Sequence, residues 1–437
     1  MPTLLTSRNT ARIGKAPHMR ARRTMPPATT RVIWLLFAAW TVDYVDRLAI
    51  NLALPDIGRD LGIGLAERGL IVSAFFLAYA LAQIPGGALA DRFGALRIVT
   101  AALVAWSLFT GLTALAFSLA SMLVIRIAFG LAQGIFPAAS LKLLSESTTP
   151  DQRMTANGRV QSANAAGALI AALASAIILP TLGWRALFLT VAVAGVFLAF
   201  VTKHLMPQPD FIESGDIESA GAPRMTVRQI LSMKSMWMFT IAYFGYNLLI
   251  WGAQSWTPSY LNEQRGVSLG ATSAWMALPT LASAAMTVLG GKLTDLRNGS
   301  PRLIAIPAMA SAAVLAIVIP YCLHIGLLIL CVTVFFGVAA LAYMPIFSLA
   351  MRNLPTSILG FGSGMILTGG MVGGIVSPTL FGAIAEQFSW HVAFASLAAG
   401  PVITILAFLG APATSERFRQ TSPLREQSTA ASGKASQ

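Results

Sequence analysis

Long apolar runs separated by short polar segments make up most of the chain. Twelve of these runs are about 20 residues long, the length of helix that crosses the apolar core of a bilayer. They predict helices at Val32 to Leu54, Leu70 to Ala90, Ile98 to Leu119, Met122 to Leu144, Val160 to Leu182, Ala186 to Val201, Met236 to Tyr260, Ala271 to Leu293, Leu303 to Leu323, Ile325 to Leu349, Ser357 to Ala385 and Val392 to Leu409. A membrane β-barrel is not favoured, because its strands alternate polar and apolar residues and these runs do not.

The longest polar interruption divides the twelve predicted helices into six and six. We therefore predict an N-terminal bundle at 32–202, a cytoplasmic linker at 203–234 and a C-terminal bundle at 235–411. The flanks are a basic N-terminal tail, 1–31, and a tail at 412–437 that is rich in Ser, Thr, Ala and Gln. We expect the second tail to be disordered, because it offers nothing apolar to bury.

Two sequence landmarks recur at almost the same spacing and indicate that the halves are duplicates. The segment from Gly87 to Asp91 returns as Gly291 to Asp295, and the segment from Trp184 to Phe188 returns as Trp390 to Phe394. The expected fold class is an all-α membrane protein of two pseudo-symmetric six-helix bundles.

The composition supports a membrane protein, and the distribution of charged residues indicates its orientation in the membrane. Hydrophobic residues make up 56% of the chain and charged residues only 11%, which does not describe a water-soluble surface. The net charge of +13 raises the alternative of a nucleic-acid partner. With a cytoplasmic N-terminus, however, 24 of the 30 Lys and Arg fall in cytoplasmic segments. That asymmetry is typical of membrane topology and places both termini in the cytoplasm, in the inner (plasma) membrane. For the first 30 residues, a transit peptide, a basic tail and a later start at Met19 or Met25 all stay open.

One motif resembles the signature of the major facilitator superfamily between its second and third helices. It runs from Gly87 through Asp91 and Arg92 to Gly94, with Ala95 and Leu96 where the family usually has basic residues. In that family Asp91 would face the positive N-terminal end of the eleventh helix and hold the cytoplasmic side shut. Gly87 would allow close helix approach. We predict gating roles for Gly87, Asp91, Arg92 and the repeat residue Asp295; a plain turn between two helices is the alternative.

Further segments resemble the anion:cation symporter group of that superfamily, over roughly residues 32 to 410. They are Tyr44 to Arg47, Ser73 to Gly87, Arg126 to Ala138 and Trp256 to Gly266. The resemblance implies transport of organic acids such as sugar acids together with protons or sodium.

Two arginines at mid-membrane depth carry the chemistry. A charge there costs at least about 2.5 to 3.5 kcal/mol, so Arg47 and Arg126 are expected to face a cavity. Guanidinium groups match a carboxylate in two-point geometry, which predicts an organic-anion site. A purely structural ion pair between Arg47 and Asp43 is the alternative. Further polar residues could bind substrate hydroxyls or only join helices: Tyr79, Gln161, Asn247, Gln254 and Tyr343.

Proton coupling is expected from carboxylates beside Arg47. We predict that Asp46, and secondarily Asp43, competes with the substrate for that arginine and takes up a proton when the substrate engages it. The family commonly has Glu where this chain has Gln133, which predicts fewer protons per cycle than in a relative with both acids. Sodium coupling stays open.

Other functions are less favoured. A proton-coupled drug or metabolite exporter of the same superfamily is the main alternative, although the fifth helix lacks the Gly-Pro motif expected there. A membrane enzyme is not favoured, because no nucleophile-base pair, His cluster or metal-ligand spacing appears. We expect no cofactor or metal, no nucleic-acid partner, and a monomer in the lipid bilayer that handles a small organic anion.

Overall fold

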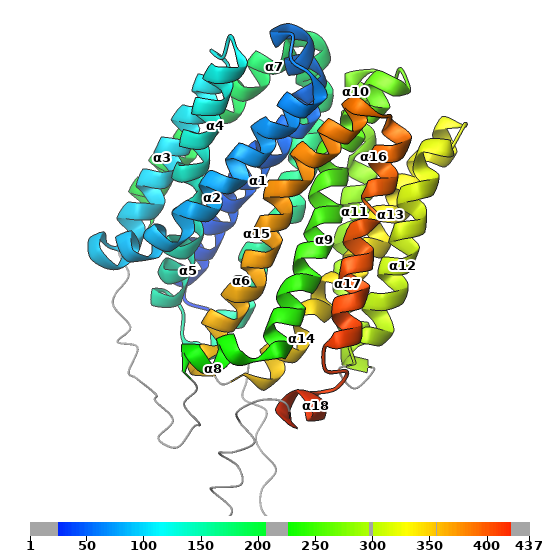
Figure 1. The fold of residues 1–437 in the computed structure, drawn as a ribbon. Coiled ribbons are helices and arrows are strands. Elements are labelled where there is room, and N and C mark those ends of the chain that lie inside the picture. Colours follow the sequence, from blue (N-terminus) through cyan, green and yellow to red (C-terminus); the bar gives the residue numbers. More distant parts are fainter. Residues whose placement is uncertain (1–24, 207–225, 297–299, 355, 421–437) are drawn as a thin grey trace, which may run out of the picture.

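The computed structural model describes residues 25–206, 226–296, 300–354 and 356–420, and the regular structure in these ranges is helical. The first half contains α1 (Pro27–Leu61), α2 (Leu65–Phe93), α3 (Ala95–Thr113), α4 (Leu119–Gly134), α5 (Phe136–Glu146), α6 (Pro150–Gln161) and α7 (Ala163–Leu205). The second half contains α8 (Val227–Ser232), α9 (Lys234–Ser259), η1 (Tyr260–Gln264), α10 (Leu269–Trp275), α11 (Ala277–Leu296), α12 (Arg302–Val318), η2 (Ile319–Tyr321), α13 (Ile325–Leu341), α14 (Tyr343–Asn353), α15 (Thr356–Gln387), α16 (Trp390–Ser396), α17 (Ala399–Gly410) and α18 (Ser415–Gln420). Figure 1 shows the two halves side by side.

These helices form the twelve expected crossings. Nine helical stretches in the described ranges are long and apolar enough to span a membrane, and one of them, Thr155–Leu205, contains two crossings. The polar and aromatic residues of α1 and α9 lower their hydropathy, and these two helices complete the set. The predicted fold class is confirmed.

Several crossings are broken two or three residues before a proline. The fourth crossing breaks at Ile135, ahead of Pro137, and the tenth breaks at Ala342, ahead of Pro345. Proline lacks a backbone N–H and clashes with the carbonyl four residues earlier, so each break lies where the helical ladder is weakest. The two breaks occupy equivalent places in the two halves.

A sharp turn inside α7 separates the fifth and sixth crossings. Gly183 adopts φ 74°, a left-handed conformation that a residue with a side chain rarely takes. Trp184 follows at once and packs edge-on against Phe188, with ring centroids 6.2 Å apart. The predicted span Ala186 to Val201 lies within this long element, as does all of the span Val160 to Leu182 except its first three residues.

The duplication is visible in matched helix crossings. A Cβ on Gly86 would lie 2.7 Å from the Cα of Ile135, and one on Gly290 would lie 2.4 Å from the carbonyl oxygen of Leu341. In both halves the second helix thus touches the break in the fourth. The close approach predicted at Gly87 is wrong by one residue, because a Cβ there would make only an ordinary contact at 3.8 Å.

The predicted ends of the bundles need three corrections. Helix α1 already begins at Pro27, and the predicted linker contains α8. The predicted C-terminal tail contains α18, whose Phe418 is fully buried and stacks on Phe239 at 6.4 Å. The tail therefore does hold an apolar anchor. The remaining predictions for the tails and linker fall on residues 1–24, 207–225 and 421–437, outside the described residues.

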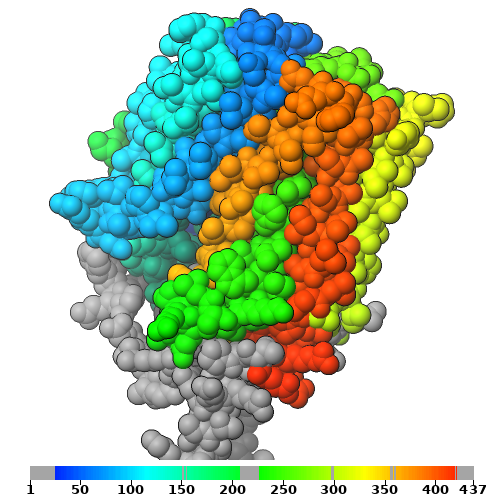
Figure 2. All heavy atoms as spheres, in the orientation of Figure 1, coloured from blue at the N-terminus to red at the C-terminus, as the bar shows by residue number. Residues whose placement is uncertain are grey.

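The two halves pack closely along α2 and α15, which run against each other on the face shown in Figure 2. A Cβ on Gly69 would lie 2.4 Å from the carbonyl oxygen of Pro378, and one on Gly382 would lie 2.5 Å from that of Leu65. Glycines therefore permit backbone-to-backbone contact from both sides of this interface.

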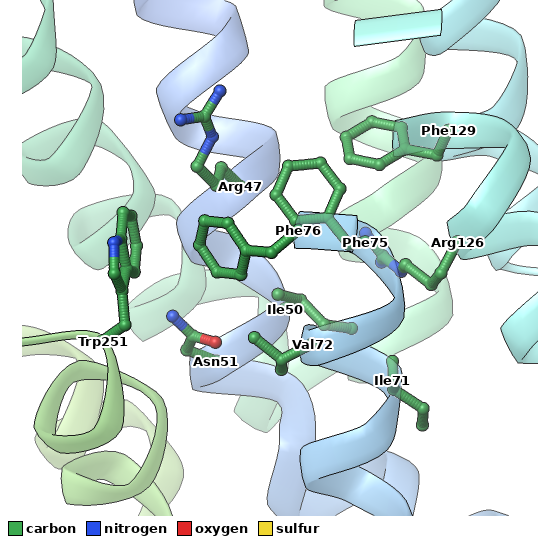
Figure 3. Close-up of a pocket in the computed structure, with 10 residues that line it drawn as sticks. All are labelled: Arg47, Ile50, Asn51, Ile71, Val72, Phe75, Phe76, Arg126, Phe129 and Trp251. Atoms are coloured by element: carbon green, nitrogen blue, oxygen red, sulfur yellow. The ribbon is translucent and has the colours of Figure 1, made fainter. Parts of the chain in front are cut away.

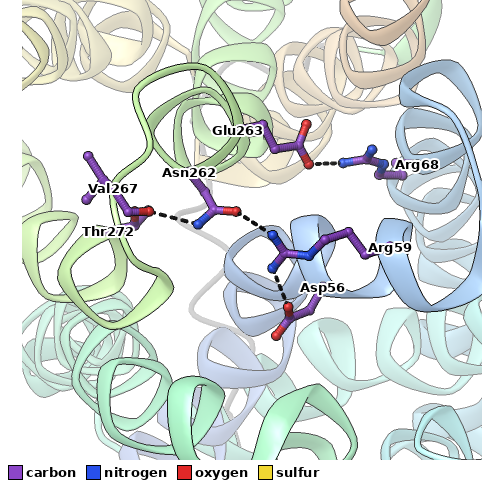
Figure 4. A network of polar contacts seen from close by, with 7 residues as sticks. All are labelled: Asp56, Arg59, Arg68, Asn262, Glu263, Val267 and Thr272. Atoms are coloured by element: carbon purple, nitrogen blue, oxygen red, sulfur yellow. Dashed lines mark hydrogen bonds and ion pairs between the residues drawn. The ribbon is translucent and has the colours of Figure 1, made fainter.

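Polar contacts between the halves gather toward the end of the molecule that holds the α1–α2 turn. Arg68 pairs with Glu263, and Arg59 donates to the side chain of Asn262 at 3.3 Å (Figure 4). Glu386 accepts a hydrogen bond from the backbone N–H of Ala66 at 2.8 Å. We call this end the closed end.

Candidate anion-binding site

Arg47 lies on α1 within a shell of acidic, amide and aromatic side chains. Its Nη2 is 3.0 Å from Oδ2 of Asp43, one turn earlier on the helix, and 3.4 Å from Oε1 of Gln133. Its guanidinium lies over the ring of Tyr79, 4.5 Å from the centroid. Gln133 also donates to the backbone carbonyl of Asp43 at 3.3 Å, which fixes the pair to α4.

Asp46 has different partners from those predicted. It is buried, and Thr110 on α3 donates a hydrogen bond to its Oδ1 at 2.8 Å. It lies close enough to Arg126 for an electrostatic interaction. Successive residues of a helix point about 100° apart, so Asp46 and Arg47 face different neighbours. The predicted pairing of Asp46 with Arg47 is wrong; Arg47 pairs with Asp43.

Arg126 on α4 is the least satisfied charged group of the site. It is 2% exposed, and its guanidinium lies 5.2 Å from the ring of Phe129 and 4.9 Å from that of Phe188. Its Nε and Nη2 have no hydrogen-bond partner among the residues that the structure describes. Burying donors of a charged group without acceptors is costly. This arginine can therefore accommodate an acceptor, such as a carboxylate.

Both arginines line one small central cavity, shown in Figure 3. Its volume is about 10 Å³, roughly the space of one water. The centroid of the Phe75 ring lies 5.6 Å from the guanidinium carbon of Arg47 and 5.4 Å from the centroid of the Phe129 ring. The rings of Phe75 and Phe129 therefore separate the two guanidinium groups. Arg47 and Arg126 thus face the protein interior and not the lipid. A substrate fits between them only if these rings move.

The other predicted substrate contacts are distributed unevenly. Tyr79 joins the shell of Arg47, and Tyr343 lies in an aromatic cluster of the second half, 5.9 Å from the ring of Tyr246. Gln254 lines a second cavity of about 30 Å³ at the interface of the halves. Asn247 is buried and donates to a carbonyl of its own helix, while Gln161 is exposed at the end of α6. Neither of the last two lines the central cavity.

The predicted gating residues pair within their own halves. Asp91 accepts a hydrogen bond from Lys142 at 2.6 Å, and Asp295 pairs with Arg352. Arg92 lies over the ring of its neighbour Phe93 at 5.2 Å. In the part of the chain that the structure describes, Asp91 makes no ion pair with the second half. Its predicted gating role toward the eleventh helix stays a prediction.

Sequence reasoning missed three residues of the site. Asn51 is buried, lines both cavities and lies four residues after Arg47, a spacing that places both on one helix face. Thr110 holds Asp46, but a threonine in an apolar run gives no sign of its partner. Trp251 brings the second half to the cavity, with its ring 4.5 Å from that of Phe76.

The sequence profile of the Major Facilitator Superfamily matches residues 35–378. The chain belongs to this superfamily. Its members are transporters, which confirms that the protein is not an enzyme. A bacterial homologue of the human lysosomal transporter Spinster, in an inward-facing and occupied conformation, superposes with a TM-score of 0.76 over 91% of this chain and 99% of that one, at 18% identity. A D-xylose–proton symporter superposes with a TM-score of 0.71 over 88% and 98%, at 14% identity.

Relatives in sequence are organic-anion transporters of the superfamily. The chain is 29% identical to the hexuronate transporter of Bacillus subtilis, over 82% of this chain and 88% of that protein. It is 26% identical to the probable L-galactonate transporter of Escherichia coli, over 69% and 70%. It is 28% identical to a probable sulfoacetate transporter of Cupriavidus necator, over 82% and 87%. The predicted branch of the superfamily is confirmed.

Proposed function

We propose that the protein imports an organic anion, a sugar acid or a related carboxylate, by proton symport with alternating access. The observation that carries this proposal is Arg126, a buried guanidinium with two unpaired donors beside a cavity that Arg47 also lines. Such a group attracts an anion, and a carboxylate that accepts hydrogen bonds from both nitrogens binds most strongly. The substrates in the names of the relatives support the same class.

Coupling follows from competition for Arg126. With the site empty, Arg126 stabilises the charged form of Asp46. When a substrate carboxylate engages the arginine, Asp46 loses its countercharge and binds a proton more readily. By linkage, the bound proton strengthens anion binding to the same degree. Asp43 stays paired with Arg47 and keeps that second guanidinium in place.

Alternating access follows from the uneven contacts between the halves. Arg68 and Glu263 join the halves at the closed end, whereas the ion pairs of Asp91 and Asp295 stay within their halves at the other end. With both termini in the cytoplasm, the closed end is extracytoplasmic and this conformation is closed to the outside. Breaking these contacts and bringing α2 and α15 together at the cytoplasmic end gives the opposite state.

Uptake into proteoliposomes tests the proposal. Labelled hexuronate, galactonate, dicarboxylates and aromatic acids are offered under an inward proton gradient, an inward sodium gradient, or neither. We expect concentrative uptake of at least one organic anion with the proton gradient. Uptake driven by sodium alone would overturn proton coupling. Proton-driven extrusion of organic cations without anion uptake would show an exporter.

A further inference from the structure

The side chains that surround the two arginines narrow the class of anion. We propose that the site prefers a carboxylate with an aromatic body, such as a benzoate, over a polyhydroxylated sugar acid. This inference rests on the proposed function, because it concerns the substrate of the same site.

The central cavity offers charge at its ends and apolar surface between them. Besides Arg47, Arg126 and Asn51, its lining is aliphatic or aromatic. Phe75, Phe76, Phe129 and Trp251 form its aromatic part, and Trp251 comes from the second half. A ligand that enters this cavity has to displace the aromatic rings. Its carboxylate then contacts an arginine, and the rest of the ligand lies against the faces of the aromatic rings.

The second half holds a cluster of tyrosines, Tyr243, Tyr246 and Tyr343, outside the lining of the central cavity. The ring of Tyr246 stacks on Tyr243 at 5.8 Å and lies 5.9 Å from Tyr343. Tyr44 of the first half lies within electrostatic range of Tyr343, and the guanidinium of Arg47 lies 5.3 Å from the ring of Tyr44.

Among the described residues of the second half, no amide side chain that could hydrogen-bond to sugar hydroxyls lines the central cavity. The Nδ2 of Asn247 donates a hydrogen bond to the backbone carbonyl of Tyr243 at 3.0 Å, and the side chain lies against Gly370 of α15. From α15, Met371 meets α2 with its sulfur 3.9 Å from Nε2 of Gln83, and further along the same helix Thr379 donates a hydrogen bond to the hydroxyl of Ser73 at 2.8 Å. A thioether is a weak acceptor and a poor replacement for water around a hydroxyl group.

The preference follows from unequal desolvation. Each hydroxyl of a sugar acid gives up hydrogen bonds to water on entry and needs a protein partner in return. An aromatic acid has one polar end, for which the arginines are suited, and an apolar ring that gains from contact with Phe, Tyr and Trp.

Equilibrium binding to the purified full-length protein tests this preference. Labelled benzoate and 4-hydroxybenzoate are compared with D-glucuronate and D-galactonate, for the wild type and for Arg47→Gln, with thermal melting as the check on folding. We expect an aromatic acid to bind at least about tenfold more tightly than either sugar acid. Tighter binding of a sugar acid, lost in folded Arg47→Gln, would overturn the aromatic preference and leave the proposed function standing. Binding of neither class would also overturn the aromatic preference, and the proposed function would then be decided by the uptake of the other organic anions.

Substitution of Tyr343 tests the role of the cluster. Tyr343→Leu removes the ring and should weaken aromatic-acid binding about threefold to tenfold relative to sugar-acid binding, whereas Tyr343→Phe keeps the ring and should weaken it less. Tyr321→Leu removes an exposed tyrosine at η2 and should leave the ratio of the two affinities unchanged. Equal losses for both classes in Tyr343→Leu would contradict the proposal.

Discussion

Arg47 and Asp43 form a buried ion pair, with Nη2 and Oδ2 3.0 Å apart on successive turns of α1. Asp46 instead accepts a hydrogen bond from Thr110 and lies within electrostatic range of Arg126, so α1 contributes to two acid–arginine units that face different neighbours. Their surroundings differ: the first unit is held by Gln133, whereas Arg126 in the second has unpaired donors. A substrate carboxylate can therefore most readily bind to Arg126 and alter its interaction with Asp46.

Replacing Asp46 by Asn should uncouple transport from protons. Asparagine keeps the size and the hydrogen bond from Thr110 but cannot take up a proton at neutral pH. We expect exchange of labelled for unlabelled substrate to continue, while accumulation driven by a proton gradient is lost. Both rates are measured in the same proteoliposomes. Accumulation that persists in Asp46→Asn would show that the coupling proton binds elsewhere.

Adding an acid at position 133 should raise the number of protons per cycle. In our account the wild type moves one proton through Asp46, so import of a monovalent anion carries no net charge. Gln133→Glu places a second carboxylate beside Arg47, where Gln133 now lies at 3.4 Å. Membrane potential alone should then drive uptake in Gln133→Glu but not in the wild type. Potential-driven uptake by the wild type would indicate that it already moves at least two protons.

Weakening the closed end should shift the conformational equilibrium. Arg68 and Glu263 are partly buried and join the two halves, so Glu263→Gln should destabilise the state closed at this end by about 1 kcal/mol, roughly a fivefold change in population. Distances between spin labels placed on the two halves at the closed end report this change.

A matched control exists at the same end. Asp60 pairs with Arg185 at 2.5 Å, but both residues belong to the first half. Asp60→Asn removes a similar charge without touching the interface and should leave the distance distribution unchanged. Equal shifts in both variants would mean that general charge at this end, and not the link between the halves, sets the equilibrium.

The fold was predictable from the sequence because bilayer crossing imposes a length and an apolar character on every span. Local interruptions were harder to predict. The break at Ile135 follows from Pro137, yet membrane helices often tolerate a proline. The buried Phe418 was missed because a single aromatic residue in a polar segment has no periodicity.

The residue types that gather around the candidate site were predicted, but their pairings only in part. Arg47, Arg126 and Tyr79 were found because charge and aromatic hydroxyls are conspicuous at mid-membrane depth. The partner of Asp46 was not predicted, because helix spacing relates only residues within α1. It does not give the rotation of α1 about its axis relative to α4. Gln161 and Asn247 were predicted from depth and type alone, and their orientation depends on packing.

Arg126 is the residue on which the account depends, and anion affinity is its most direct measure. The anion with the greatest uptake is titrated against purified wild type, Arg126→Lys and Arg126→Gln, with the exposed Arg185→Lys as control and melting temperature as the check on folding. Lysine keeps the charge but loses the planar fork, so we expect at least about tenfold weaker binding in Arg126→Lys and a greater loss in Arg126→Gln. Folded Arg126 variants that bind the anion as tightly as the wild type would contradict the account.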